Sequence, residues 1–216
     1  ILPPKEEIIN KTISINDLRD ISFRDFFDRK ISKINKKLII YLYNKNILVT
    51  GGAGSIGSEL ASQICNAGSK KVIIYDNNET ELFRSSQNIP HKNAEYVLGD
   101  INDIEYLKKI IKKYKIQHVF HAAAYKHLNI LENNFENAIK INLFGTLNVL
   151  NSLNDNVKSF VLISTDKAVN PKSYLGISKR LAEIITQNWK KNKTSIVRFG
   201  NVFGSRGSVL EVFFNQ

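Results

Sequence analysis

The chain has 216 residues, of which 43% are hydrophobic and 24% charged, as in an ordinary soluble globular protein with one well-buried domain. No apolar run approaches the ~20 residues that span a bilayer, and no signal-peptide pattern opens the chain. The single cysteine, Cys65, excludes an internal disulfide and favours a reducing compartment, so we expect a cytoplasmic domain.

The net charge of +11 comes from lysines spread over most of the chain rather than from one tract. In "YLKKIIKKYK" the lysines alternate with Ile110, Ile111 and Tyr114 at helical spacing, which indicates a solvated helix face opposite a core face. We therefore expect no nucleic-acid partner. Some positive charge would still suit a diphosphate-bearing substrate or an anionic membrane nearby.

The first 44 residues differ from the rest. "LPP" favours an extended linker, and "SINDLRD" and "SFRDFFDR" each begin with serine and carry an aspartate three residues later, as short capped helices do. We predict a helical N-terminal extension over residues 1–44. The sequence begins at Ile1, contains no methionine and stops within an amphipathic pattern, "GSVLEVFFNQ", so we expect a fragment of a longer protein.

From residue 46 onward, short β-branched runs alternate with helical patterns. The predicted strands are 46–50, 71–75, 94–99, 118–124, 159–165 and 195–200, and the predicted helices are 58–67, 79–87, 104–114, 132–153 and 175–190. Six strands with intervening helices predict a Rossmann-like α/β domain over residues 45–216. Its doubly wound parallel sheet has helices on both faces.

The first predicted strand leads into a glycine loop. "ILVTGGAGSIGSEL" places Gly51, Gly54 and Gly57 at three-residue spacing, after a strand and at the start of a helix. Glycine is needed where the chain turns tightly, where backbone approaches a pyrophosphate, and where helix meets strand. The free N–H groups of the helix N-terminus add a site for the phosphates. This context predicts dinucleotide binding, with Ser55 and Ile56 as further contacts.

The ends of the next strands supply the other cofactor residues. Asp76 stands nineteen residues after Gly57, where a carboxylate binds both ribose hydroxyls and repels a 2′-phosphate, so NAD is favoured over NADP. Asp100 either reaches the adenine or caps the helix that follows, with Ile101 beside it. Small side chains after the fourth strand let the cofactor approach the backbone, and these are Ala122, Ala123 and Ala124.

Several motifs together resemble one known family. GxxGxxG, "HAAA", "INLFGT", "STDKAVNP", "GISKRLAE" and "VRFGNVFGSRGSV" resemble extended short-chain dehydrogenases/reductases that act on nucleotide sugars. They are most similar to the polysaccharide-biosynthesis (CapD-like) branch, whose best-known members are UDP-N-acetylglucosamine 4,6-dehydratases. The resemblance implies that a C-terminal substrate lobe is missing here. It also implies a parent protein anchored to the inner membrane through a transmembrane region absent from this sequence, with this domain on the cytoplasmic side.

The resemblance assigns roles to individual residues. Thr165 would hold the C4 hydroxyl of a UDP-sugar, Asp166 would act as the acid and Lys167 as the base, and Lys179 would hold the nicotinamide ribose. Asp166 must then keep a proton, which needs a raised pKa. We expect Lys126, His127 and Asn201 to bind substrate.

The catalytic tyrosine of short-chain dehydrogenases is not in its usual place. That tyrosine stands four residues before the lysine, but here Leu175 occupies the position and Tyr174 stands five before Lys179. Four residues of a helix advance ~400° and return to one face, whereas five advance ~500° and do not. We therefore predict that Tyr174 has a packing or substrate-lining role. The resemblance implies that the tyrosine position is variable in this branch, and which group takes the C4 hydroxyl proton stays open.

Other readings stay open at this stage. Asn142 is either a functional polar group or, as we favour, a buried helix residue satisfied locally. His118 and His121 show no metal-ligand partners, so no metal site is predicted. A UDP-sugar 4-epimerase and a non-catalytic NAD-binding module are the alternative functions, and a homo-oligomer is open.

Overall fold

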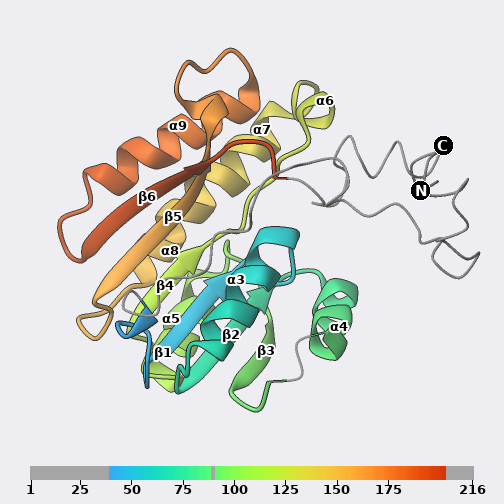
Figure 1. Ribbon diagram of the computed structural model, residues 1–216. Coiled ribbons are helices and arrows are strands. Elements are labelled where there is room, and N and C mark those ends of the chain that lie inside the picture. Colours follow the sequence, from blue (N-terminus) through green and yellow to red (C-terminus); the bar gives the residue numbers. More distant parts are fainter. Residues whose placement is uncertain (1–38, 89–90, 203–216) are drawn as a thin grey trace, which may run out of the picture.

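The computed structural model describes residues 39–88 and 91–202, which form an α/β domain around one parallel sheet (Figure 1). The sheet has six strands in the order β3-β2-β1-β4-β5-β6. Their bounds are β1 Asn46–Thr50, β2 Lys71–Asp76, β3 Ala94–Leu98, β4 His118–His121, β5 Ser159–Thr165 and β6 Lys193–Phe199. The predicted doubly wound sheet is confirmed.

The strand order reverses at β1. This strand pairs with β2 on one side and with β4 on the other, so Thr50 lies beside both Tyr75 and His121. The chain therefore builds outward first in one direction and then in the other. In such sheets the crevice for a ligand opens where the order reverses, at the carboxyl ends of the strands.

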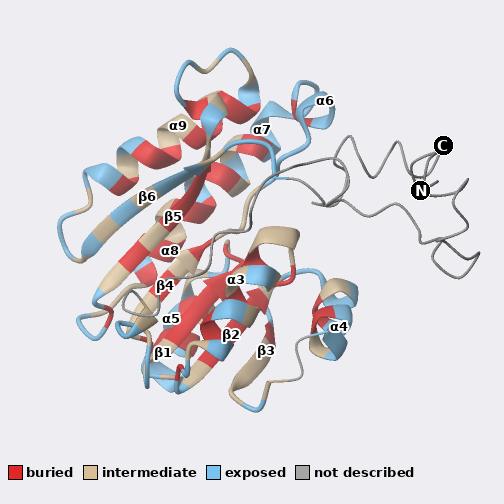
Figure 2. Cartoon of the chain, viewed as in Figure 1, coloured by how far each residue is buried: buried red, intermediate tan, exposed pale blue. Residues whose placement is uncertain are grey.

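Helices cover both faces of the sheet. Side chains such as Ile47, Val49 and Ile74 pack on one face, against residues of α3 and α4. Leu48 and Ile73, their neighbours in the strands, pack on the other face against α5, α8 and α9. These helices are α3 Ser55–Asn66, α4 Glu79–Asn88, α5 Ile104–Lys113, α8 Thr146–Ser152 and α9 Tyr174–Gln187. The central strands β1 and β2 are therefore buried on both faces, as their near-continuous apolar sequences require, whereas the edge strand β6 is exposed or half-buried along its length (Figure 2).

The predicted helix 132–153 is present from residue 135 to residue 152, and it contains a π-helical stretch that the sequence did not predict. The elements of this region are α6 Leu128–Leu131, α7 Phe135–Ala138 and the π-helix η3 Ile139–Gly145. Apolar periodicity does not distinguish a π turn from an α turn, so the sequence alone could not locate the π-helical stretch within this continuous helix.

Some predictions lie outside the described residues. They are the two capped helices of the N-terminal extension and the amphipathic pattern at the end of the chain. Within residues 39–88 and 91–202, no helix is both long and apolar enough to cross a bilayer. The domain boundaries themselves stay predictions.

Candidate active site and cofactor cleft

The glycine loop forms a close-packed cradle between β1 and α3. Gly51 has φ +65°, and a Cβ added to it would lie 2.5 Å from the backbone N of Ala123. A Cβ on Gly57 would collide with the carbonyl oxygen of Gly51. Any side chain at these two positions would therefore displace backbone, so the loop keeps its shape only with glycine. The result is a shallow backbone surface at the start of α3, as pyrophosphate binding requires.

Asp76 connects this loop to the end of β2. Its carboxylate accepts hydrogen bonds from the backbone N of Ala53 (3.0 Å) and of Asn78 (3.0 Å). The carboxylate also lines a cavity of about 150 Å³, together with Gly51, Ile101 and Ala123. Asp76 therefore stands at a fixed position beside the glycine loop.

Asp100 does not have the capping role considered for it. The N-cap of α5 is Asp103, whose carboxylate accepts from the backbone N of Tyr106 at 2.9 Å. The Asp100 carboxylate accepts instead from the backbone and side-chain nitrogens of Asn102, at 2.8 and 2.9 Å. Asp100 is therefore not the cap of α5, because the capping residue is Asp103, three residues later.

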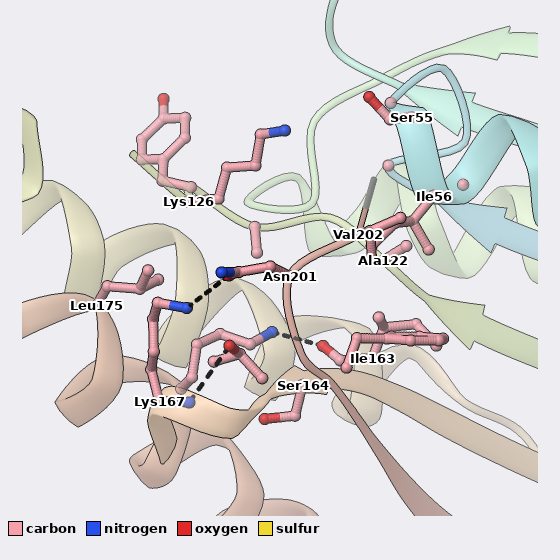
Figure 3. Close-up of a pocket in the computed structure, with 18 of the residues that line it drawn as sticks. Ser55, Ile56, Ala122, Lys126, Ile163, Ser164, Lys167, Leu175, Asn201 and Val202 are labelled. Carbon is pink, nitrogen blue, oxygen red and sulfur yellow. Dashed lines mark hydrogen bonds between the residues drawn. The ribbon is translucent and has the colours of Figure 1, made fainter. Parts of the chain in front are cut away.

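A larger cavity of about 460 Å³ adjoins the smaller one, and the two share five lining residues. Figure 3 shows Ser55 and Ile56 on one side of it, across from Lys167 and Leu175, with Asn201 between them. Its lining brings together residues from the ends of β1, β4, β5 and β6 and from the first turns of α3 and α9. Its volume is within the usual range for a small-molecule site.

Lys179 is the buried cation of this cavity. Its side chain comes from α9, is only 4% exposed as a residue, and donates a 2.7 Å hydrogen bond from Nζ to the carbonyl oxygen of Ile163. Burial lowers the pKa of Lys179 to about 8, and the nearby carboxylate of Glu183 acts in the opposite direction. The ammonium is therefore held at the end of β5 and still faces the cavity.

Thr165, Asp166 and Lys167 follow at the end of β5. Thr165 donates from Oγ1 to Asp166 Oδ1 at 2.9 Å, and Lys167 donates from Nζ to Asp166 Oδ1 and to Asn201 Oδ1, at 3.3 Å each. Thr165, Lys167 and Asn201 line the large cavity, whereas Asp166 does not, and its side chain is 57% exposed.

The pKa of Asp166 is shifted in the direction opposite to the expected one. We expected burial to raise its pKa, but the hydrogen bond from Thr165 and the Lys167 ammonium hold the pKa of the Asp166 carboxyl below its ordinary value. The physical reason is exposure: without desolvation, donors and a cation stabilise the charged form. In this structure the Asp166 side chain is therefore an ionised carboxylate rather than a protonated acid.

Leu175 and Tyr174 are placed as the helical register predicts. Leu175 is 6% exposed, contacts Leu131 and Ala138, and lines the large cavity one turn before Lys179. Tyr174 packs its ring on Phe135, with centroids 4.5 Å apart, and does not line the cavity. Of its two predicted roles, packing is therefore the one that the structure has.

A buried carboxylate behind the cavity is a residue that sequence reasoning missed. Glu183, one turn beyond Lys179 on α9, accepts from Ser164 Oγ (2.7 Å), from Arg180 (3.0 Å) and from Arg198 of β6 (2.8 and 2.6 Å). The donors lower the pKa of Glu183 to about 2, with Arg198 as the largest cause. The motif "GISKRLAE" could have indicated this residue, because Glu183 stands four residues after Lys179 and so lies on the same helix face.

Asn142 and His121 form a second buried network. The Asn142 side chain bonds both backbone groups of Tyr125 and donates to Ser178 Oγ at 3.0 Å, so it is buried as predicted, although its partners are distant in sequence rather than local. His121 lies between the hydroxyls of Thr50 (2.6 Å) and Thr146 (3.0 Å). Burial lowers the pKa of His121 to about 3, so this imidazole is neutral.

Most of the predicted site residues meet in the two cavities. Those in the large cavity are Gly51, Gly54, Ser55, Ile56, Gly57, Ala122, Ala124, Lys126, His127, Thr165, Lys167, Lys179 and Asn201. Asp76, Ile101 and Ala123 line the smaller one, and Asp100 and Asp166 line neither. The structure gives their positions, and their roles stay predictions. In the part of the chain that the structure describes, no three His, Cys, Asp or Glu side chains gather as a metal site would require.

Comparison with known proteins agrees with this geometry. Residues 47–216 match the family described as "Polysaccharide biosynthesis protein". The chain belongs to this family. Within the extended short-chain dehydrogenases/reductases, it is the CapD-like branch that the sequence motifs indicated.

Three relatives show the range of the family. The "Capsular polysaccharide biosynthesis protein CapD" of Staphylococcus aureus is 38% identical over all of this chain and 38% of its own length. A "UDP-N-acetylglucosamine 4,6-dehydratase (inverting)" of Campylobacter jejuni is 37% identical over 78% of this chain and 52% of its own. A "UDP-glucose 4-epimerase" of Rickettsia rickettsii is 33% identical over 80% and 53%. This chain thus spans about half of these relatives, or less.

Solved structures show the same fold. Pen from Bacillus thuringiensis superimposes with a TM-score of 0.76 at 34% identity, over 82% of this chain and 58% of that one. The Bordetella bronchiseptica enzyme WbmH, solved in complex with NAD+, gives a TM-score of 0.69 at 26% identity, over 80% and 62%.

Proposed function

We propose that this chain forms the NAD-binding and catalytic part of a nucleotide-sugar 4,6-dehydratase acting on UDP-N-acetylglucosamine. The observation that carries the proposal is the meeting of Thr165, Lys167 and Lys179 in one cavity with the glycine loop. A C. jejuni relative with the dehydratase name and the NAD+ complex of WbmH support it.

The cradle fits a dinucleotide. Gly51 and Gly57 leave room only for backbone, so a pyrophosphate can approach the start of α3. Asp76 would bind the adenosine ribose hydroxyls, and Lys179 the ribose of the nicotinamide. When bound, NAD supplies a hydride acceptor for C4 of the sugar and later returns the hydride to C6.

The residues at the end of β5 would manage the protons. Thr165 would orient the C4 hydroxyl, whose proton passes to solvent as the hydride leaves C4. Lys167 would remove the proton from C5 once C4 is a ketone and would return it to C5 when the hydride reaches C6. Asp166 would protonate the departing C6 hydroxyl, which leaves as water. Lys126, His127 and Asn201 would hold the UDP-sugar. Asp166 is an exposed carboxylate in this structure, so in this mechanism bound substrate must cover it and raise its pKa.

A 4-epimerase is the second candidate, because a relative with that name is 33% identical to this chain. Epimerisation needs the same oxidation at C4 but no elimination, so the acid and base at positions 166 and 167 would have no task.

The mass of the product separates these functions. The full-length natural protein is incubated with NAD and UDP-N-acetylglucosamine, and the nucleotide sugars are analysed by mass spectrometry. A dehydratase gives a product lighter by one water. An epimer has an unchanged mass and different stereochemistry, and no product with NAD bound would indicate a non-catalytic module. Lys167→Ala, in the same assay, should greatly slow the loss of water and leave NAD binding intact.

A further inference from the structure

Lysines from six separate connections meet at one edge of the sheet. Because all strands are parallel, the segments that lead into them lie together at the amino-terminal ends of the strands. This end of the sheet is opposite the cavities, and we refer to it as an edge. Each of these segments carries lysine, and we call the set the lysine edge. It consists of Lys45, Lys70, Lys71, Lys92, Lys112, Lys113, Lys115, Lys158, Lys190, Lys191 and Lys193.

Little negative charge balances this edge. In the described segments 39–46, 67–71, 91–95, 112–118, 153–159 and 188–193, the carboxylates are Glu95 and Asp155. The Glu95 carboxylate already accepts hydrogen bonds from Lys71 Nζ, at 2.6 Å, and from the hydroxyl of Tyr114. These two donors lower the pKa of Glu95. The lysines therefore produce a one-sided positive potential that the sequence, with its charge dispersed, did not indicate.

Exposed apolar and aromatic side chains adjoin the same edge. Ile40, Tyr41 and Tyr43 are 70%, 72% and 64% exposed. Their segment is fixed to the edge, because the backbone N of Asn44 donates to the carbonyl oxygen of Gly68 at 2.9 Å, just before β2. Figure 1 shows these first described residues, in blue, beside the start of β1.

We propose that the lysine edge docks on an anionic phospholipid surface, with the cavities facing away from the lipid. Lysines near an anionic leaflet are attracted to its headgroups, and tyrosines favour the boundary between headgroups and water. Docking in this orientation keeps the mouth of the site open to a water-soluble substrate.

A nucleic acid fits these observations less well. Arginine is the preferred reader of phosphate and base edges, and the six segments contain no arginine. The arginines of the described residues lie elsewhere and pair with carboxylates: Arg84 with Glu81, and Arg180 and Arg198 with Glu183.

The test is co-sedimentation of the chain with vesicles of phosphatidylcholine alone or with 30 mol% phosphatidylglycerol. Two variants with the same change in charge are compared: Lys70→Glu/Lys112→Glu at the edge, and Lys140→Glu/Lys172→Glu, exposed lysines away from it. We expect binding to the anionic vesicles only, weaker at higher salt, and reduced at least about tenfold by the edge variant. The control variant should stay within about twofold of the unmodified chain.

Trp189 supplies a positional readout, since it is the single tryptophan of the chain and lies with its ring 5.4 Å from Lys191 Nζ. Brominated lipids should quench its fluorescence when the edge is docked. Unchanged vesicle binding by the edge variant, equal losses in both variants, or absence of quenching would each overturn the proposal. Tighter binding to duplex RNA or DNA than to vesicles at equal salt, lost in the edge variant, would overturn it in favour of a nucleic-acid surface.

Discussion

The guanidinium of Arg198 donates two hydrogen bonds, of 2.8 and 2.6 Å, to the wholly buried carboxylate of Glu183. This pair joins β6 to α9, and Ser164 Oγ joins the same carboxylate to β5. Three elements that carry site residues are thus held by one anion.

Arg198→Ala should lower the free energy of unfolding more than the control below, because it leaves the buried Glu183 carboxylate with only Ser164 and Arg180 as donors. Arg84→Ala is the matched control: its partner Glu81 lies at 2.8 Å, but the Arg84 side chain is 65% exposed, so the cost should be at most about 1 kcal/mol. Urea unfolding measures both variants. Equal small losses would show that the Glu183 network does not stabilise the fold.

The stability should also depend on pH through Glu183. Its pKa is lowered from 4.5 to about 2 in the folded chain, so the unfolded chain binds more protons between these values. The stabilisation is therefore complete above pH 4.5 and is lost as the pH falls toward 2. Unfolding free energies measured over this range should fall more steeply for the unmodified chain than for Glu183→Gln. Parallel pH curves would contradict this assignment.

Asp76→Ala should narrow the preference for NAD over NADP. The unmodified chain should bind NAD much more tightly, because the carboxylate accepts from the ribose hydroxyls and repels a 2′-phosphate. The ratio of the two affinities, by calorimetry, is the proper readout, since loss of the contact with Ala53 weakens the loop for both cofactors. Equal affinities in the unmodified chain would refute the role of Asp76.

Tyr174→Phe should leave the rate within a few-fold of the unmodified enzyme, because the ring that packs on Phe135 is kept and the hydroxyl does not line the cavity. The folding of Leu175→Ala must be checked before its rate is compared with that of Tyr174→Phe, because truncating a buried leucine lowers the free energy of unfolding by ~2–5 kcal/mol. The rate is measured in the full-length protein. A loss of rate in Tyr174→Phe as large as that in Lys167→Ala would indicate that Tyr174 is the base after all.

Asp166→Asn and Lys167→Ala should each lower the dehydration rate by roughly 10²–10⁴-fold, since each removes a group that must move a proton. NAD affinity should be unchanged in both. Lys172→Ala, an exposed neighbour outside the cavity, is the control and should have full activity. If Asp166→Asn kept full activity, another group would have to be the acid.

The sequence was sufficient where one local pattern has one structural meaning. The β-branched runs located all six strands, and the spacing of Gly51, Gly54 and Gly57 located the cradle. It was insufficient where the meaning depends on partners that are distant in the chain. The pKa of Asp166 depends on exposure, and the lysine edge depends on which connections the sheet brings together.

The position of β1 between β2 and β4 has a consequence for the order of assembly. β1, β2 and β3 are consecutive neighbours and can pair as soon as they have been synthesised. β4 must return to β1, and Thr50 and His121, which then meet, are 71 residues apart. Pairings across such separations form slowly, so we expect the half that carries the glycine loop to be assembled first and to serve as the template for the half that carries Lys179.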